Sequence, residues 1–139
     1  MVPVLDETMN AWLRDLLGRH AAVAGTVHVV KDGVLAITAA HNIPPKVQEV
    51  TASIPIGKGM AGLAWQHDRA IQTCNLQEDS SGAVKPGAKA VDARAAVALP
   101  VHDASGAVCA VVGLAWMDER VLDDATLATI GRDAASLPV

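Results

Sequence analysis

The residues with the clearest chemical potential form a glycine-rich turn, Gly57-Lys58-Gly59, which opens a short apolar helix expected at Met60 to Gln66. Glycine tolerates positive φ angles that other residues resist, and this suits a tight turn. The N–H groups at about Lys58 to Ala61 would be unpaired at the helix start, where they attract anions, and Lys58 adds a charge. The alternative is that the glycines only shape the turn and Lys58 is solvated. The sequence favours neither interpretation.

The glycines at positions 57, 59 and 62 do not indicate dinucleotide binding. That fingerprint needs a strand, a turn and a helix within a parallel βαβ unit, followed by an acidic residue. Here Lys31-Asp32-Gly33 predicts a hairpin turn, with strands at Ala24 to Val30 and Val34 to His41. Hairpins require antiparallel pairing, so the sequence argues against a dinucleotide site.

Cysteines and histidines offer no catalytic or metal-binding constellation. Cys74 and Cys109 are too few for a disulfide framework and lack metal-ligand spacing. Both fall in expected strands, as small buried apolar residues, whereas a thiolate nucleophile needs exposure and a lowered pKa. The five histidines lie in no haem motif and are expected to be structural or exposed: His20, His28, His41, His67 and His102. We therefore expect no catalytic residue, no metal and no cofactor.

The composition bounds the remaining possibilities. The 139 residues form one domain with a core of aliphatic side chains, since the chain has three Trp but no Phe or Tyr. A net charge of -4 without a basic cluster argues against nucleic acid as a partner. No apolar stretch reaches membrane-spanning length, and the N-terminus lacks a signal-peptide pattern. We expect no membrane contact and a cytoplasmic location.

Elements at both ends must hold the central turn in place. Apolar residues at spacings of three and four predict helices over residues 5–20 and about 121–136. Three further strands are expected at Ala70 to Leu76, Arg94 to His102 and Val108 to Trp116, with a helical turn at Lys46 to Val50. The polar loop from Gln77 to Asp92 is long enough to be functional or mobile. Hairpins covered by terminal helices indicate an α+β sandwich.

Four motifs in order make the chain resemble a GAF domain over nearly its whole length. They are the glycine turn at positions 57, 59 and 62, the strand Ala70 to Asn75, the segment Leu99-Pro100-Val101, and the apolar strand after Gly106. The resemblance implies a GAF/profilin-like fold with a central antiparallel sheet of five to six strands. Terminal helices would cover one face, and short helices with the long loop would enclose a small-molecule pocket on the other.

The resemblance also implies function. GAF domains usually serve as sensory or regulatory modules, and the Asn-Lys-Phe-Asp-Glu signature of cyclic-nucleotide-binding members is absent here. A bilin would require a cysteine in the long loop, which has none. We expect a stand-alone, homodimeric sensor that binds a small polar or anionic ligand non-covalently and signals through a protein partner. The sequence favours a non-enzymatic role over an enzymatic one.

Two alternatives stay open. Free methionine-(R)-sulfoxide reductases are stand-alone GAF enzymes, but their cysteines lie in the glycine-turn helix and in the loop before the Leu-Pro-Val strand. This chain has none there, so such an enzyme would have to use Cys74 or Cys109. The other alternative is a dimeric structural adaptor without ligand, in which the apolar stripes of the terminal helices form the dimer rather than pack on the sheet.

Eight residues are candidates for the ligand site: Lys58, Gly59, Met60, Ala61, Trp65, Val84, Lys85 and Arg94. Trp65 lies on the same helix face as Ala61 and would either line the pocket or pack in the core, and core packing is favoured. Lys85 and Arg94 could close over an acidic ligand, although a solvated charged loop is slightly preferred. Trp12 and Trp116 are expected where the first helix meets the sheet.

Overall fold

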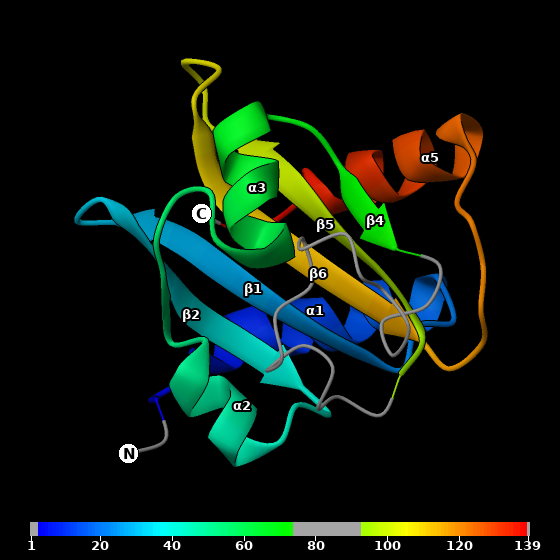
Figure 1. The fold of residues 1–139 in the computed structure, drawn as a ribbon, viewed down its shortest axis with the longest axis horizontal. Coiled ribbons are helices and arrows are strands. Elements are labelled where there is room, and N and C mark those ends of the chain that lie inside the picture. Colours follow the sequence, from blue (N-terminus) through cyan, green and yellow to red (C-terminus); the bar gives the residue numbers. More distant parts are fainter. Residues whose placement is uncertain (1–2, 74–92, 139) are drawn as a thin grey trace.

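Six antiparallel strands form the central sheet, in the order β3-β2-β1-β6-β5-β4 (Figure 1). The computed structural model describes residues 3–73 and 93–138 of the chain. The strands are β1 (Ala24–Lys31), β2 (Val34–His41), β3 (Ser53–Ile54), β4 (Ile71–Thr73), β5 (Ala95–His102) and β6 (Val108–Trp116). Every pairing is antiparallel, which confirms the predicted sheet.

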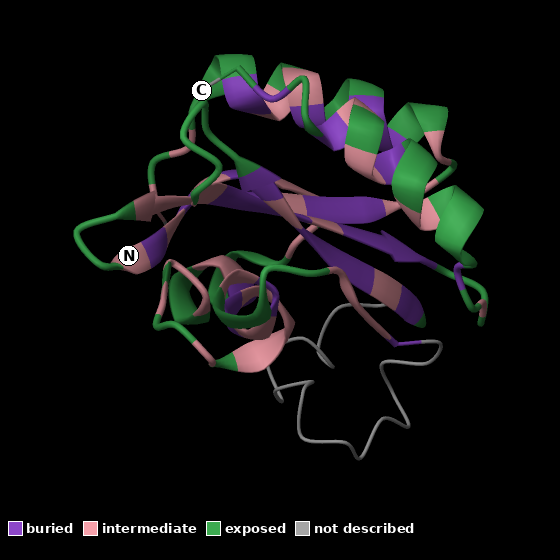
Figure 2. Ribbon diagram, turned by 90° about the horizontal axis from the view of Figure 1, so that it is seen from above, coloured by how far each residue is buried: buried purple, intermediate pink, exposed green. Residues whose placement is uncertain are grey.

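Helices cover both faces of the sheet (Figure 2). Those in the described residues are α1 (Glu7–Arg19), α2 (Pro45–Val50), α3 (Gly59–His67) and α5 (Asp124–Ala134). The terminal helices α1 and α5 lie on one face, and the short helices α2 and α3 lie on the other, as predicted. The expected loop from Gln77 to Asp92 lies outside the described residues. Within residues 3–73 and 93–138, no helix has the length and apolar character needed to cross a membrane.

Aspartates fix where the terminal helices begin. The side chain of Asp6 accepts a hydrogen bond from the Met9 N–H at 2.9 Å, and Asp123 accepts one from the Thr126 N–H at 2.8 Å. A capping carboxylate satisfies a helix N–H that has no intrahelical partner. Because Asp123 caps α5, the helix starts at Asp124, and the expected start near residue 121 was three residues too early.

The larger apolar core lies between the sheet and the terminal helices. α1 contributes Met9, Leu13, Leu16 and Leu17, and the C-terminal segment contributes Ile130, Ala134 and Leu137. The opposing strand positions of β5 and β6 are filled mainly by Val and Leu side chains from the same cluster. The two predicted stripes are therefore used within one chain to pack the helices on the sheet.

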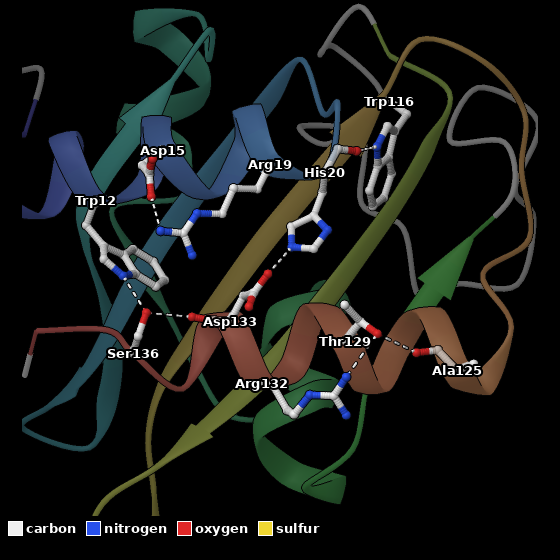
Figure 3. A network of polar contacts seen from close by, with 10 residues as sticks. All are labelled: Trp12, Asp15, Arg19, His20, Trp116, Ala125, Thr129, Arg132, Asp133 and Ser136. Atoms are coloured by element: carbon white, nitrogen blue, oxygen red, sulfur yellow. Dashed lines mark hydrogen bonds and ion pairs between the residues drawn. The ribbon is translucent and has the colours of Figure 1, made fainter.

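Polar contacts join α1 to α5 (Figure 3). Nε2 of His20, the C-cap residue of α1, lies 2.8 Å from Oδ2 of Asp133 in α5. Trp12 of α1 donates its Nε1–H to the hydroxyl of Ser136 at 3.0 Å. Trp116 of β6 donates its Nε1–H to the carbonyl of His20 at 2.9 Å. Trp116 thus lies where α1 meets the sheet, as predicted, whereas Trp12 contacts the segment that follows α5.

Short strands account for the main differences from the predicted elements. β3 was not predicted, because its two residues, Ser53 and Ile54, are too few to show a period. Only Ile71–Thr73 of the expected strand Ala70 to Leu76 is described as β4, and the residues from Cys74 onward lie outside the described part. The hairpin turn is confirmed, since Asp32 and Gly33 have φ angles of 52° and 80°.

Candidate functional site

A cavity of about 290 Å³ lies between the sheet and the two short helices. Its floor comes from β1, β5 and β6. Its walls come from α2, from the segment around β3 and from the start of α3. Figure 1 shows α2 and α3 as separate helices in front of the sheet. Concave, mostly apolar sites of roughly 300 Å³ and above are typical for small molecules, so this cavity is the candidate site.

Small residues from three neighbouring strands form the floor. Ala98 of β5 pairs with Gly113 of β6, which in turn pairs with Thr26 of β1. In the adjacent row, Ala96 pairs with Ala115. Successive residues of a strand alternate between the two faces, and these positions share the face that lies opposite α1 and α5. Larger side chains at these positions would fill the space, so the cavity follows from this set of residues.

The glycine turn holds the start of α3 against the cavity. Gly57 has a φ angle of 82° and donates its N–H to the carbonyl of Gly62 at 2.9 Å. A Cβ at Gly62 would lie 2.7 Å from the carbonyl oxygen of Pro55, which leaves no room for a side chain. The glycine pattern therefore lets the turn and the helix approach closely. This approach places Met60 and Ala61 in the cavity wall.

Positive charge lies at the α3 end of the cavity. Lys58 is the N-cap residue of α3, and its side chain is exposed. Its N–H donates to the carbonyl of Pro55 at 3.2 Å, so the expectation that unpaired N–H groups begin at Lys58 was wrong by one residue. The next three residues form the first turn of α3, where N–H groups lack intrahelical acceptors and acidic side chains are absent. Lys58 and the helix dipole together favour negative charge here.

His28 lines the cavity as a buried, neutral imidazole, with 3% of its surface exposed. Its Nε2 lies 2.8 Å from the carbonyl oxygen of Thr51, and because a carbonyl can only accept, Nε2 carries the proton. Nδ1 is then an acceptor, and it has no hydrogen-bond partner among the described residues. Burial lowers the pKa of His28, and the hydrogen bond to Thr51 offsets part of this effect.

The sequence led us to expect that His28 is structural or exposed, and it did not connect His28 with the pocket. The sequence signal that could have assigned His28 to the cavity face of the sheet is the alternation of side chains between the two faces along β1. Val27 belongs to the core beneath α1, so its neighbour His28 must lie on the opposite face. The small residues of the floor were missed in the same way, because β6 was interpreted as a strand uniformly buried on both faces.

The eight predicted ligand-site residues do not all come together. Four of them line the cavity: Lys58, Gly59, Met60 and Ala61. Trp65 packs in the apolar cluster under α3 and is not among the lining residues, in line with the favoured core role. Arg94 lies just before β5, and its Nη1 is 3.7 Å from Oε1 of Glu119; it is not among the lining residues. Val84 and Lys85 lie outside the described residues.

Cys109 has the properties of a structural thiol. It is the extra residue of β6 where the pairing with β5 shifts between Val101 and His102, and this leaves it half-buried rather than fully buried as expected. Burial, followed by the negative charge of Asp103, raises the pKa of the Cys109 thiol. It does not line the cavity, and Cys74 lies outside the described residues.

Solved structures share this fold at low sequence identity. The GAF domain of a phosphoenolpyruvate-protein phosphotransferase from Coxiella burnetii matches with a TM-score of 0.73 and 14% identity, covering 97% of this chain and 78% of that chain. A domain of a putative two-component sensor histidine kinase from Sinorhizobium meliloti matches with a TM-score of 0.73 and 13% identity, covering 97% and 88%. The type II free methionine-R-sulfoxide reductase from Thermoplasma acidophilum matches with a TM-score of 0.70 and 15% identity, covering 94% and 89%.

Identities this low establish a common fold and nothing about a common ligand or reaction. A comparison with curated proteins finds no significant match. The family is shown by the sequence instead, because the family profile described as GAF domain matches residues 4–136, nearly the entire chain. The chain therefore belongs to the GAF domain family.

Proposed function

We propose that this chain is a sensory or regulatory module that binds a small molecule non-covalently in the cavity between the sheet and helices α2 and α3. The observation that carries the proposal is the cavity of about 290 Å³ over a floor of small residues. A typical GAF domain is a ligand-binding regulatory unit. One of the structures with the same fold is a domain of a putative sensor histidine kinase.

The backbone of β1 offers a route from the cavity to α1. Gly25 lines the cavity, and a Cβ placed on Gly25 would lie 2.9 Å from Cδ2 of Leu17 and 3.3 Å from Cδ1 of Leu13. The two leucines of α1 thus pack directly on the backbone of the strand. A ligand that displaces β1 would move α1, which is joined to α5 by the contact between His20 and Asp133. We expect a protein partner to respond to these helices, and slower amide hydrogen exchange in α1 on ligand binding would support this route.

A homodimer remains a prediction. The apolar stripes of α1 and α5 are used in the core of one chain, so a dimer would have to form through other surfaces, such as the exposed outer faces of these helices (Figure 2). This use of the stripes removes one reason for a purely structural adaptor. Sedimentation velocity tests the dimer, since a purely monomeric species at high protein concentration would exclude it.

Filling the cavity tests the proposed function. Ala96 is a half-buried floor residue, and in the variant Ala96→Leu the larger side chain should occupy ligand space without disturbing the core under α1 and α5. Thermal-shift screening of the wild-type protein against small carboxylates, amides and nucleotides should find binders. A ligand at about a hundred times its dissociation constant adds about 2.7 kcal/mol of stability. The Ala96→Leu variant should have a melting temperature no lower than that of the wild type, and the ligands should not raise this temperature.

Two outcomes would contradict the proposal. The first is an unchanged melting temperature of the wild type across the whole panel. The second is an equal response of the Ala96→Leu variant, which would place binding elsewhere. Ala107→Leu is the matched control, because Ala107 lies in the exposed turn between β5 and β6, away from the cavity, and its variant should retain the response.

A reductase function has less support. Several structures with the same fold are free methionine-R-sulfoxide reductases, including those from Thermoplasma acidophilum and Neisseria meningitidis. Here the raised pKa of Cys109 keeps it a thiol at neutral pH, whereas the attacking species would be the thiolate. Turnover of free methionine sulfoxide with thioredoxin and its reductase, lost when Cys74 or Cys109 is replaced, would establish the enzyme and overturn the non-enzymatic assignment.

A further inference from the structure

The ligand class can be narrowed from the distribution of polar groups in the cavity. We infer that the cavity takes a small molecule with an apolar body and one anionic end group. The body lies on the floor of small residues, and the anionic end lies at Lys58 and the first turn of α3. This inference rests on the proposed function, because it presumes that the cavity is the ligand site.

The body of the ligand is apolar because the floor and most of the walls are. Ala96, Ala98 and Ala115 present methyl groups from the floor, and Val47 and Met60 face them from α2 and α3. An apolar cavity of about 150 Å³ is large enough to hold benzene. A volume of about 290 Å³ therefore accommodates one ring with a short side chain, or a branched aliphatic chain of similar size.

Few polar groups in the wall are free to bind a polar ligand. The Thr51 hydroxyl donates to the carbonyl of Val47 at 2.7 Å, and the Thr51 carbonyl accepts from His28. The hydroxyls of Thr26 and Ser53 and the buried Nδ1 of His28 have no hydrogen-bond partner among the described residues, and each can meet one polar atom of a ligand. A ligand with more hydroxyl or charged groups than these would leave the surplus groups unpaired, which opposes binding. The floor therefore selects against sugars and compact dianions.

The single charge of the ligand is negative because the residues that line the cavity near the start of α3 favour an anion. Lys58 is the one charged side chain among the described lining residues, and no carboxylate lies among them. The first turn of α3 adds N–H groups and the positive end of the helix dipole. Elsewhere in the wall, neutral His28 offers only an acceptor nitrogen, so it provides no donor for an anion. These groups orient an anionic end toward Lys58 and exclude a cationic one.

Three probes with the same body and different end groups test this inference. They are phenylpropanoate, phenylpropanamide and phenylpropylamine, which carry negative, zero and positive charge, and binding is measured by isothermal titration. The carboxylate should bind about tenfold more tightly than the amide, and the amine most weakly. Lys58→Gln should weaken carboxylate binding about fivefold and leave the amide unchanged. Lys31→Gln, an exposed lysine at the β1–β2 hairpin, is the matched control and should change neither.

The outcomes separate this inference from the proposed function. Equal affinities for the three probes, all lost in Ala96→Leu, would overturn the anionic end while the cavity keeps its role. Binding of a compact dianion such as 2-oxoglutarate, without binding of any phenyl probe, would overturn the apolar body. An equal loss of carboxylate and amide binding in Lys58→Gln would also overturn the inference, because the lysine would then act on shape rather than charge. Failure of all four compounds to bind the wild type would contradict the proposed function as well.

Discussion

Single residues create the cavity because they are small and share one face of the sheet. Ala96 and Ala98 of β5 lie beside Ala115 and Gly113 of β6, and they alternate with the Val and Leu residues that pack under α1 and α5. The same two strands thus build a dense core on one face and a vacant floor on the other. Because the floor residues have little side chain to rearrange, one larger residue among them is enough to change the volume of the cavity.

Buried His28 makes the stability of the protein depend on pH. Burial holds its pKa in the folded chain below the ordinary value of 6.5. As the pH falls through about 6.5, the unfolded chain takes up a proton that folded His28 does not, and the free energy of unfolding decreases. Above about pH 7.5 the imidazole is neutral in both states, and the contribution vanishes.

The variant His28→Gln isolates this contribution, because the amide can still donate to the Thr51 carbonyl but does not titrate. Between about pH 7.5 and pH 5.5, urea denaturation should show that the free energy of unfolding falls more steeply for the wild type than for the variant. The difference should reach up to about 1.4 kcal/mol per pH unit. The other four histidines are present in both proteins, so their contributions cancel. Parallel stability curves for the two proteins would show that His28 is protonated in the folded state.

Residue types alone predicted only part of the cavity lining. Lys58, Gly59, Met60 and Ala61 were identified because a glycine turn before a helix is a visible pattern. The alanines of the floor were not, since an alanine in an apolar strand is equally compatible with a helix packed closely above it. Whether such alanines line a cavity or are covered by a closely packed helix depends on the distance of α2 and α3 from the sheet. That distance is set by contacts between segments far apart in sequence.

Among the elements, α3 depends most on a close backbone contact. The variant Gly62→Ala would bring a Cβ to 2.7 Å from the Pro55 oxygen and 3.1 Å from the Gly57 nitrogen, both of them backbone atoms. We expect a loss of about 1–3 kcal/mol in the free energy of unfolding, as for other overpacked sites. Chemical denaturation measures this change.

The variant Gly131→Ala is the matched control, because Gly131 lies within α5 and a Cβ there meets no atom within 4 Å. Alanine restricts the unfolded chain and favours the helix, so this variant should gain about 0.5–1 kcal/mol. A Gly62→Ala variant that is as stable as the wild type would show that the turn can relax. The glycine at position 62 would then have no structural role.

Helices and strands were predictable where they are long enough to show a periodic pattern of apolar residues or are joined by a recognisable turn. The apolar stripe of α1 and the Asp32–Gly33 turn of the first hairpin are local patterns, and both are confirmed. The two-residue strand β3 and the start of α5 at Asp124 are not visible as periods. β3 exists because the segment after α2 pairs with β2, and α5 starts where a carboxylate caps it.

At the scale of the whole molecule, the sheet separates two layers with different packing. The face toward α1 and α5 is filled by large aliphatic side chains, and polar contacts such as His20 with Asp133 tie the two helices together (Figure 3). The face toward α2 and α3 keeps a cavity. At Gly25 only the backbone of β1 separates the two layers, because Gly25 lines the cavity while Leu13 and Leu17 of α1 pack against its other side. This arrangement would let a ligand in one layer alter the other.

Methionine methyl groups report most directly on whether a small molecule occupies the cavity. Met60 lines it, whereas Met117 is exposed in the segment after β6 and does not. In a protein labelled with ¹³C-methyl methionine, titration with phenylpropanoate should shift the Met60 signal until it saturates and leave the Met117 signal unmoved. The shift should be lost in Ala96→Leu. A Met60 signal that stays in place at saturating ligand, or one that shifts equally in Ala96→Leu, would contradict ligand binding in this cavity.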